Sequence, residues 1–354
     1  MFFMRTSAKI NLKGLNLEEI TSLLAALGEK PYRARQIYQW LYQKRATDWS
    51  QMSNIPLALR TKLAERFELS SVRLQNLVHS RIDGSVKFLF ELTDGNLIEA
   101  VYMPEDRRRT VCLSSQVGCP IGCAFCATGV MGLKRNLTAG EIIDQLLFIN
   151  ANMPVPATNV VFMGMGEPFL NYENVIRAAR IFNSELGPEL SARHITISTC
   201  GVIPGIERFT AEDQRFKLAI SLNATTDEQR DKIIPINRKY PIKELLGVAK
   251  NYTRVSRRRV TFEYILIAGL NDTIKDAQRL VKLLSPIPCK LNLIPYNDNQ
   301  QFPYRAPSEE HLNEFIQEIY QAPFAVTVRR SKGLDIAAAC GQLYVTEQNK
   351  RNLR

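Results

Sequence analysis

The chain has 354 residues, enough for one large domain and a small accessory one, and 45% of them are hydrophobic, an ordinary supply for a core. Its net charge of +11 is less ordinary, because a protein with so much excess Lys and Arg tends to meet a polyanion. No apolar stretch approaches the ~20 residues of a membrane span, the N-terminal apolar run is too short for a signal peptide, and the seven cysteines lack disulfide-like spacing. We therefore expect a cytoplasmic protein without membrane contact.

The first segment, residues 1–70, is expected to form a small helical domain that binds RNA. Asn16, with Glu19 three residues later, predicts an N-cap and capping box for a first helix that Gly28 stops. Two more helices are expected, over residues 33–44 and after Pro56. Aromatic residues interleaved with basic ones on the second helix favour a small core with a basic face toward phosphates.

Residues 71–104 are expected to form a β-hairpin extension. Residues 86–92 and 97–102 alternate with period two on either side of Asp94-Gly95-Asn96, a pattern typical of a hairpin with an Asp-Gly turn. Glu99 falls on the same face as Leu97 and Val101. A carboxylate on an apolar face is unusual.

Strand and helix patterns then alternate, which is typical of parallel βαβ units. Strands are expected at residues 110–114, 159–163, 194–198, 217–221, 260–267 and 290–294, with a further extended piece at 324–329. Six such units predict an α/β fold with a partial (β/α)6 barrel over residues 105–339, followed by a C-terminal segment at 340–354. Polar and glycine residues gather after these strands, where parallel α/β folds place their active sites.

Basic residues gather in five clusters, and several lie near the strand ends that would form this site. The clusters are residues 107–109, 134–135, 257–259, 329–330 with 332, and 350–351 with 354. RNA or DNA is therefore the favoured partner, and solubility alone is the alternative explanation of the charge.

A CxxxCxxC motif follows the first strand of the barrel and brings three cysteines close together, Cys119, Cys123 and Cys126. Structural zinc normally takes four protein ligands, usually as two separated pairs, and no second CxxC is present. A 4Fe-4S cluster also takes four ligands, so a compact set of three suggests that a small molecule occupies the fourth position. The spacing favours an iron-sulfur cluster with one open iron over zinc or inert buried thiols.

This spacing, with Phe125 before the last cysteine, resembles the signature of the radical S-adenosylmethionine (SAM) superfamily. The resemblance implies that the methionyl part of SAM chelates the open iron and that the reduced cluster splits the sulfonium to a 5'-deoxyadenosyl radical. The run Gly164-Met165-Gly166-Glu167-Pro168 is similar to the superfamily element that grips the methionyl amino group. The alternative is a helix N-terminus with Glu in its first turn.

Six separated motifs resemble the RlmN/Cfr family of radical SAM RNA adenine methyltransferases. They are residues 114–119, 134–138, 163–168, 233–237, 292–295, and 335 with 338–343, and residues 28–34 extend the resemblance into the first domain. The family resemblance implies that Cys340 takes a methyl group from one SAM, and that a second SAM at the cluster yields the radical that activates it. Cys112 would release the product through a disulfide with Cys340, and Glu99 matches the proton acceptor. On spacing alone, both cysteines would be small buried hydrophobes.

The same matching assigns the SAM contacts. They are Gly166, Glu167, Ser198, Ser221, Leu222, Asn223 and Asn297. From the residues alone, the serines and asparagines would be strand-end caps. Asn223 stands where the family usually has His, although Asn can still donate and accept a hydrogen bond. Cys200 and Cys289 have no role that the sequence supports.

Within the family, RlmN-type enzymes methylate carbon 2 of an adenosine in 23S rRNA and of the adenosine 3' to the anticodon in some tRNAs, whereas Cfr-type enzymes methylate carbon 8. Pro168 and the N-terminal helical domain favour carbon 2, while residues 126–129 and 132–134 resemble Cfr. We expect a monomer that acts on 23S rRNA and tRNA with an external electron donor. A zinc-stabilised RNA-binding protein without catalysis is the alternative from a different class.

Overall fold

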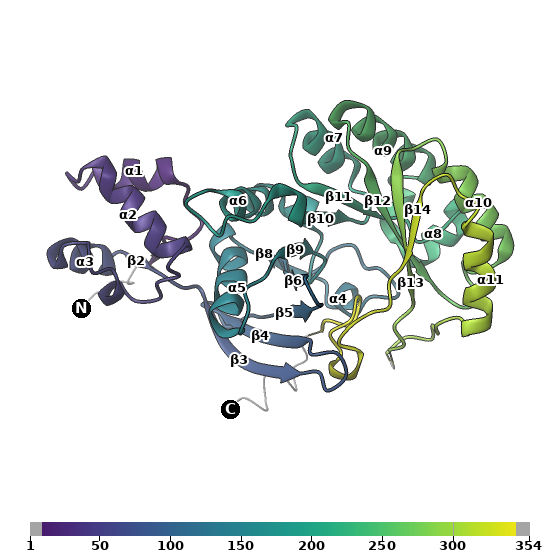
Figure 1. The fold of residues 1–354 in the computed structure, drawn as a ribbon, viewed down its shortest axis with the longest axis horizontal. Coiled ribbons are helices and arrows are strands. Elements are labelled where there is room, and N and C mark those ends of the chain that lie inside the picture. The colour runs from purple at the N-terminus through teal and green to yellow at the C-terminus, as the bar shows by residue number, and fades with distance from the viewer. Residues whose placement is uncertain (1–8, 300, 345–354) are drawn as a thin grey trace, which may run out of the picture.

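A ten-stranded mixed sheet forms the centre of the computed structural model, which describes residues 9–299 and 301–344 (Figure 1). The strand order is β14-β13-β12-β11-β10-β9-β6-β5-β4-β3, with β14 and β3 at the open edges. Neighbours from β6 to β14 are parallel, and those from β3 to β6 are antiparallel. This arrangement confirms the α/β fold with a partial barrel.

The parallel strands correspond to the predicted ones, and their ends differ by about two residues at most, the usual uncertainty of element boundaries. They are β6 (Arg109–Cys112), β9 (Asn159–Phe162), β10 (Ile195–Thr199), β11 (Lys217–Ser221), β12 (Val260–Leu266), β13 (Cys289–Pro295) and β14 (Ala325–Val328). Most of these strands are rich in Val and Ile because helices cover the outer face of the barrel and most of the side chains on its inner face are buried as well. The carboxyl ends of these strands meet at one end of the barrel, which places the following loops together.

Helices connect these strands along the outside of the barrel (Figure 1). They are α5 (Ala139–Asn152), α6 (Tyr172–Asn183), α7 (Ile203–Ala211), α8 (Asp227–Ile233), α9 (Ile242–Ser256), α10 (Ile274–Leu284) and α11 (Glu309–Ile319). Short 3-10 turns complete the connections: η2 (Pro168–Asn171), η3 (Ala192–His194) and η4 (Pro235–Arg238).

The predicted hairpin is formed by β4 (Val86–Leu92) and β5 (Leu97–Pro104), and an unpredicted strand, β3 (Val72–His79), pairs with β4. At the turn, Gly95 has a φ of 76° and its N–H donates to Leu92 O at 2.9 Å. These three strands continue the sheet of the barrel without a break. The division of the chain at residue 104 therefore stays a prediction.

The N-terminal helices lie to one side of the barrel (Figure 1). They are α1 (Leu17–Ala25), α2 (Pro31–Tyr42) and α3 (Leu57–Ala64), with η1 (Trp49–Gln51) between the last two, and β1 (Ile10–Asn11) pairs with β2 (Phe67–Glu68) beneath them. The predicted capping box is present, because Asn16 Oδ1 accepts from Glu19 N and a Glu19 carboxylate oxygen accepts from Asn16 N, both at 2.8 Å.

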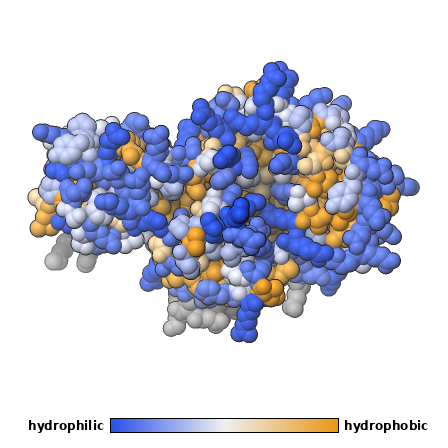
Figure 2. All heavy atoms as spheres, viewed as in Figure 1, coloured by the Kyte–Doolittle hydropathy of each residue, from blue (hydrophilic) through white to orange (hydrophobic). Residues whose placement is uncertain are grey.

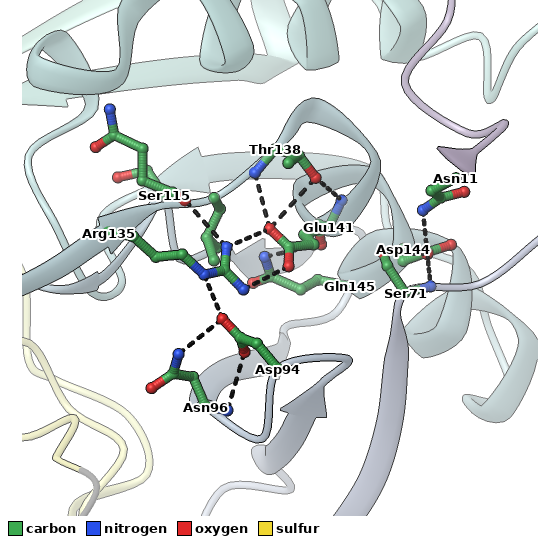
Figure 3. A network of polar contacts seen from close by, with 12 residues as sticks. Asn11, Ser71, Asp94, Asn96, Ser115, Arg135, Thr138, Glu141, Asp144 and Gln145 are labelled. Carbon is green, nitrogen blue, oxygen red and sulfur yellow. Dashed lines mark hydrogen bonds and ion pairs between the residues drawn. The ribbon is translucent and has the colours of Figure 1, made fainter. Parts of the chain in front are cut away.

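A buried polar network joins the segment before α1 to the barrel, and Figure 3 shows part of it, the contacts of Asp144 with Asn11 and Ser71. Lys13 Nζ lies 2.8 Å from Asp144 Oδ1, and both side chains are at most 3% exposed. The other oxygen of Asp144 accepts from Ser71 N at 2.7 Å and from Ser71 Oγ at 2.8 Å. Asp144 on α5 therefore holds Lys13 and Ser71, which lie on either side of the N-terminal helices, against the barrel. Removing one partner of such a buried ion pair is strongly destabilising.

Hydrophilic residues cover most of the face in Figure 2, with smaller hydrophobic patches between them. Within residues 9–299 and 301–344, no helix is both long enough and apolar enough to span a membrane.

Candidate active site

The three cysteines of the predicted cluster motif lie in a loop clamped at its base by two short strands. β7 (Gln116–Gly118) and β8 (Leu133–Asn136) pair antiparallel, and Cys119 N donates to Gly132 O at 3.0 Å. Gly118 has a φ of 77°, and a Cβ there would lie 1.8 Å from Gly132 O, so only glycine fits this base. Cys126 leads into the short helix α4 (Ala127–Val130).

All three sulfur-bearing residues line one cavity of about 150 Å³ at the carboxyl ends of the strands. The predicted residues Gly166, Glu167, Ser198, Ser221, Asn223 and Cys340 line the same cavity. Burial raises the pKa of Cys119 to about 12 and raises the pKa values of Cys123 and Cys126 as well. In the described part of the chain, no three Cys, His, Asp or Glu side chains converge on one point as ligands of a single metal ion would.

This donor set fits an iron-sulfur cluster and SAM. The cysteines surround a space instead of a point, which suits a cluster with several irons, and the thiols would lose their protons on binding. Two buried atoms at the cavity, Asn223 Nδ2 and Glu263 Oε2, have no hydrogen-bond partner among the described residues. Unpaired buried polar atoms indicate that a ligand completes the site.

Glu167 is held at the cavity by the backbone around it. Its Oε1 accepts from Phe169 N at 3.0 Å and its Oε2 accepts from Cys200 N at 2.8 Å, so it also caps the turn η2. Burial raises the pKa of Glu167, and the hydrogen bonds from Cys200 oppose that rise. Gly166 has a φ of 101°, and a Cβ there would lie 2.6 Å from the Gln116 side chain. The loop therefore needs glycine before the carboxylate.

Two of the predicted SAM contacts do not line the cavity. The Leu222 side chain is buried in the core, and its backbone N–H donates to Glu263 O at 3.0 Å. Asn297 lies after β13, where its Nδ2 donates to Cys340 O at 3.0 Å. Asn297 thus holds the C-terminal segment, which also explains why that cysteine reaches the site.

Cys340 lies on a wall shared by two cavities. It lines the large cavity with the three cysteines and a smaller one of about 20 Å³ with Cys112. The turn η5 (Leu334–Ile336) leads to it, and Ala127 N donates to Gly341 O at 2.7 Å, which ties the segment to α4. Burial raises the pKa of Cys112 to about 12, and nearby Cys340 adds to the rise. Residues 345–354, the rest of the predicted C-terminal segment, lie outside the described residues.

Glu99 lies on β5 beneath this segment and lines neither of these two cavities. It is 2% exposed, its Oε1 lies 3.1 Å from Lys87 Nζ, and its Oε2 accepts from Tyr344 N at 2.9 Å. Burial raises the pKa of Glu99, and Lys87 opposes the rise.

Arg329 belongs to one of the predicted basic clusters, but the structure places its side chain at the cysteines instead. The side chain lines the small cavity with Cys112 and Cys340, and its Nη1 lies 3.9 Å from Met163 Sδ. The negative charge that a Cys340 thiolate would carry raises the pKa of Arg329, with Glu263 acting in the same direction. No spacing signal marks this residue, because the contact depends on how β14 joins the sheet.

Other basic clusters also differ from expectation. Residues 107–109 include the first residue of β6 and the two before it, and residues 257–259 precede β12, so both clusters lie at the amino ends of the parallel strands, opposite the cavity. Arg135 pairs with Asp94 and Glu141, and Arg330 pairs with Glu309 (Arg135 in Figure 3). Lys134, by contrast, is exposed beside the cysteine loop. The tail cluster at 350–354 lies outside the described residues.

Comparison with known proteins agrees with this site. A family model described as the ribosomal RNA large subunit methyltransferase N-terminal domain matches residues 10–69, and a radical SAM superfamily model matches residues 113–284. A dual-specificity RNA methyltransferase RlmN from Anaeromyxobacter sp. (strain Fw109-5) is 47% identical, over 96% of this chain and 92% of its own. This chain belongs to the RlmN family of radical SAM methyltransferases.

Further relatives support the same membership. The RlmN of Geobacter sulfurreducens is 47% identical over 94% of this chain and 92% of its own. The crystal structure of a radical SAM methyltransferase from Sphaerobacter thermophilus superposes with a TM-score of 0.90 at 45% identity, covering 94% of this chain and 99% of that one. The RlmN-family match therefore spans both the N-terminal helices and the barrel.

Proposed function

We propose that this chain methylates carbon 2 of an adenosine in 23S rRNA, and of the adenosine 3' to the anticodon in tRNAs, using two SAM molecules per turnover. The observation that carries the proposal is the place of Cys340, which joins the cavity of the three cysteines to the small cavity of Cys112. A methyl carrier needs access to both a methyl donor and a resolving thiol. Family membership supports the RNA substrate, and the protein acts as a monomer with an external electron donor.

The residues at the cavity fall into two groups, those that would hold the cluster and those that would bind SAM. Cys119, Cys123 and Cys126 would hold a 4Fe-4S cluster, which when bound supplies the electron for cleavage of SAM. Glu167 offers a carboxylate to the methionyl ammonium, with Gly166, Ser198, Ser221 and Asn223 around it, while Leu222 contributes only backbone.

Cys340 is the nucleophile of the first half of the reaction. Its sulfur attacks the methyl carbon of SAM, the carbon–sulfonium bond breaks, and S-adenosylhomocysteine leaves with the electron pair. Arg329 lines the small cavity with both cysteines, where its positive charge opposes the burial that raises the pKa of the resolving thiol, Cys112. In the second half, the carbon carried on the Cys340 sulfur is bonded to the adenine ring, Glu99 accepts the proton that the ring carbon loses, and the electron supplied for SAM cleavage is returned. The Cys112 thiolate then attacks the Cys340 sulfur, the sulfur–carbon bond breaks, and its electron pair goes with a proton to the carbon that becomes the methyl group of the product, which leaves a disulfide between Cys112 and Cys340.

The test is mass spectrometry of RNA nucleosides after reaction with anaerobically reconstituted protein. We expect 2-methyladenosine in a 23S rRNA fragment and in tRNA; 8-methyladenosine would assign Cfr-type chemistry instead. The Cys112→Ala variant should accumulate RNA attached covalently to Cys340, and Cys340→Ala should form neither adduct nor product. The buried Cys289, which lines neither cavity, supplies the control Cys289→Ala, expected to be active. Full methylation by Cys340→Ala would exclude the methyl-carrier role.

A further inference from the structure

Arg230 on α8 is 0% exposed, and its guanidinium donates hydrogen bonds to three backbone carbonyls and one side chain. The carbonyls are Leu222 O at 2.9 Å and Ser221 O at 3.1 Å, at the end of β11, and Cys200 O after β10. The side chain is that of Asn237 on η4, whose Oδ1 accepts at 3.0 Å. All of these acceptors are uncharged, so a buried positive charge lies here without an ion pair to any described residue. No role assigned above uses this charge.

The charge of Arg230 is only partly balanced by its surroundings. Burial lowers the pKa of Arg230, but an arginine keeps its proton because its ordinary pKa lies far above neutrality. Asp227 and Asp231, on the same helix, oppose this fall, yet their carboxylates accept from Asn237 Nδ2, at 3.0 and 2.7 Å, and not from Arg230. Both carboxylates are partly exposed, so water screens them. Because a buried charge is costly unless it is paired, a further anion close to Arg230 is expected.

The cysteine loop lies beside Arg230. Ile233, at the end of α8, accepts from Ala124 N at 3.0 Å, and Ala124 directly follows Cys123. Cys200, whose carbonyl binds Arg230, lines the large cavity together with the three cysteines of the cluster motif, whereas Arg230 itself does not line it. Burial raises the pKa of Cys123, and the positive charge of Arg230 opposes that rise. The charge of Arg230 therefore reaches the cysteine loop from behind the wall of the cavity.

We propose that the buried charge of Arg230 raises the reduction potential of the iron-sulfur cluster, an inference that rests on the proposed function. A cluster held by three thiolates becomes more negative when it takes up an electron from the external donor. Net charge is one of the factors that set the potential of such clusters. A fixed positive charge nearby in the interior, where the dielectric constant is low, favours the more negative state. Arg230 thus favours the reduction that precedes cleavage of SAM, although it lines no part of the cavity.

A role in folding alone is the alternative, and it predicts a different change of potential. The hydrogen bonds of Arg230 also tie the ends of β10 and β11 to α8 and η4. If Arg230 only held these elements together, its loss would loosen the wall behind the cysteine loop and admit water. Water solvates the more highly charged, reduced cluster better than the oxidised one. The potential would then rise or stay unchanged, whereas loss of a nearby positive charge lowers it.

The test compares Arg230→Gln with Arg230→Lys, because both variants lose the forked hydrogen bonds of the guanidinium and they differ by one charge. Electron paramagnetic resonance of anaerobically reconstituted protein without SAM, poised at a series of potentials, measures the midpoint potential of the cluster. Arg230→Gln should shift the equilibrium about tenfold toward the oxidised cluster, which lowers the potential by about 59 mV for one electron. Arg230→Lys should stay close to the wild type. A potential that rises or does not change in Arg230→Gln would overturn the proposal.

Asp231→Asn is the matched control, because it also removes one charge from α8, but from a partly exposed side chain that water screens. Its potential should change much less than that of Arg230→Gln. An equally large change, in either direction, would overturn the special place of Arg230. Should Arg230→Gln take up no iron, Arg230→Lys carries the test, and a tenfold shift toward the oxidised cluster despite the retained charge would overturn the proposal.

The proposed function is tested separately in the same protein preparations. If the wild type forms 2-methyladenosine while Arg230→Gln keeps the wild-type potential, only the role of Arg230 is overturned. If the reconstituted wild type shows no cluster signal, both the role of Arg230 and the proposed function are overturned.

Discussion

Arg329 is a partly buried cation that lines the small cavity with two thiols, and no carboxylate within the described residues lies at ion-pair distance from it. Replacing Arg329 by Met should slow alkylation of Cys112 by iodoacetamide about tenfold, since the positive charge of Arg329 opposes the rise that burial causes in the pKa of the Cys112 thiol. Mass spectrometry of the Cys112 peptide from cluster-free protein measures this rate. Arg330 is the matched control, because it is exposed and paired with Glu309. Equal rates in Arg329→Met and Arg330→Met would remove Arg329 from the mechanism.

Glu99 gives a pH-dependent test of its environment. Burial raises the pKa of Glu99 above 4.5, so its contribution to stability is full below the unfolded value and is lost as pH rises through the folded value. Glu99→Gln removes this loss. The free energy of unfolding of the variant should therefore increase relative to that of the wild type as pH rises from 4.5 toward neutrality. Urea titrations at each pH measure the difference.

Glu91 supplies the control of opposite sign. A hydrogen bond from Arg73 lowers the pKa of Glu91, so this carboxylate contributes stability that is lost as pH falls. The free energy of unfolding of Glu91→Gln should therefore decrease relative to that of the wild type as pH rises. The same trend in both variants would show that Glu99 is not buried as described.

At the scale of elements, Gly118 at the base of the cysteine loop is the most constrained position. Gly118→Ala would drive a Cβ into Gly132 O, separate β7 from β8 and displace Cys119. Iron bound per chain after reconstitution should fall severalfold. Gly122 has a similar φ of 70° but open space around a Cβ, so Gly122→Ala should lose much less iron. If the two variants retain equal iron, backbone strain and not the close approach explains the glycine.

The elements that could be predicted from the sequence are those whose signals lie within a few residues of one another. The hairpin has its Asp-Gly turn and α1 has its capping box, and both signals lie within a few residues. β3 lacks such a signal, because its register shifts between Leu74 and Asn76 and many of its side chains face solvent. The three cysteines of the cluster motif are close in sequence. Arg329 and Cys112, by contrast, line the same cavity only because of the order of strands across the whole sheet.

At the scale of the whole molecule, the order of the strands in the sheet decides which charged residues lie near the cavity. Glu263 and Arg329 are near enough to affect each other's pKa only because β12, β13 and β14 are neighbours, and periodicity along one strand cannot give that order. The same limit misplaced two basic clusters, at residues 107–109 and 257–259, which the sheet turns away from the carboxyl ends of the strands. Charge counts thus predicted an RNA partner but not the surface that meets it.

Lys134 is exposed beside the cysteine loop, whereas the exposed Arg259 lies at the opposite end of the barrel, so we expect RNA bound at the cavity to contact Lys134 and not Arg259. Each lysine or arginine that contacts a phosphate releases about 0.7 to 0.9 of a counterion. Lys134→Ala should therefore lower the slope of log affinity against log salt by about that amount, and Arg259→Ala should leave it unchanged. Both variants remove one charge, so total charge cannot explain a difference between them. Binding of a 23S rRNA fragment at several salt concentrations measures the slopes, and equal slopes would mean that RNA approaches from another side.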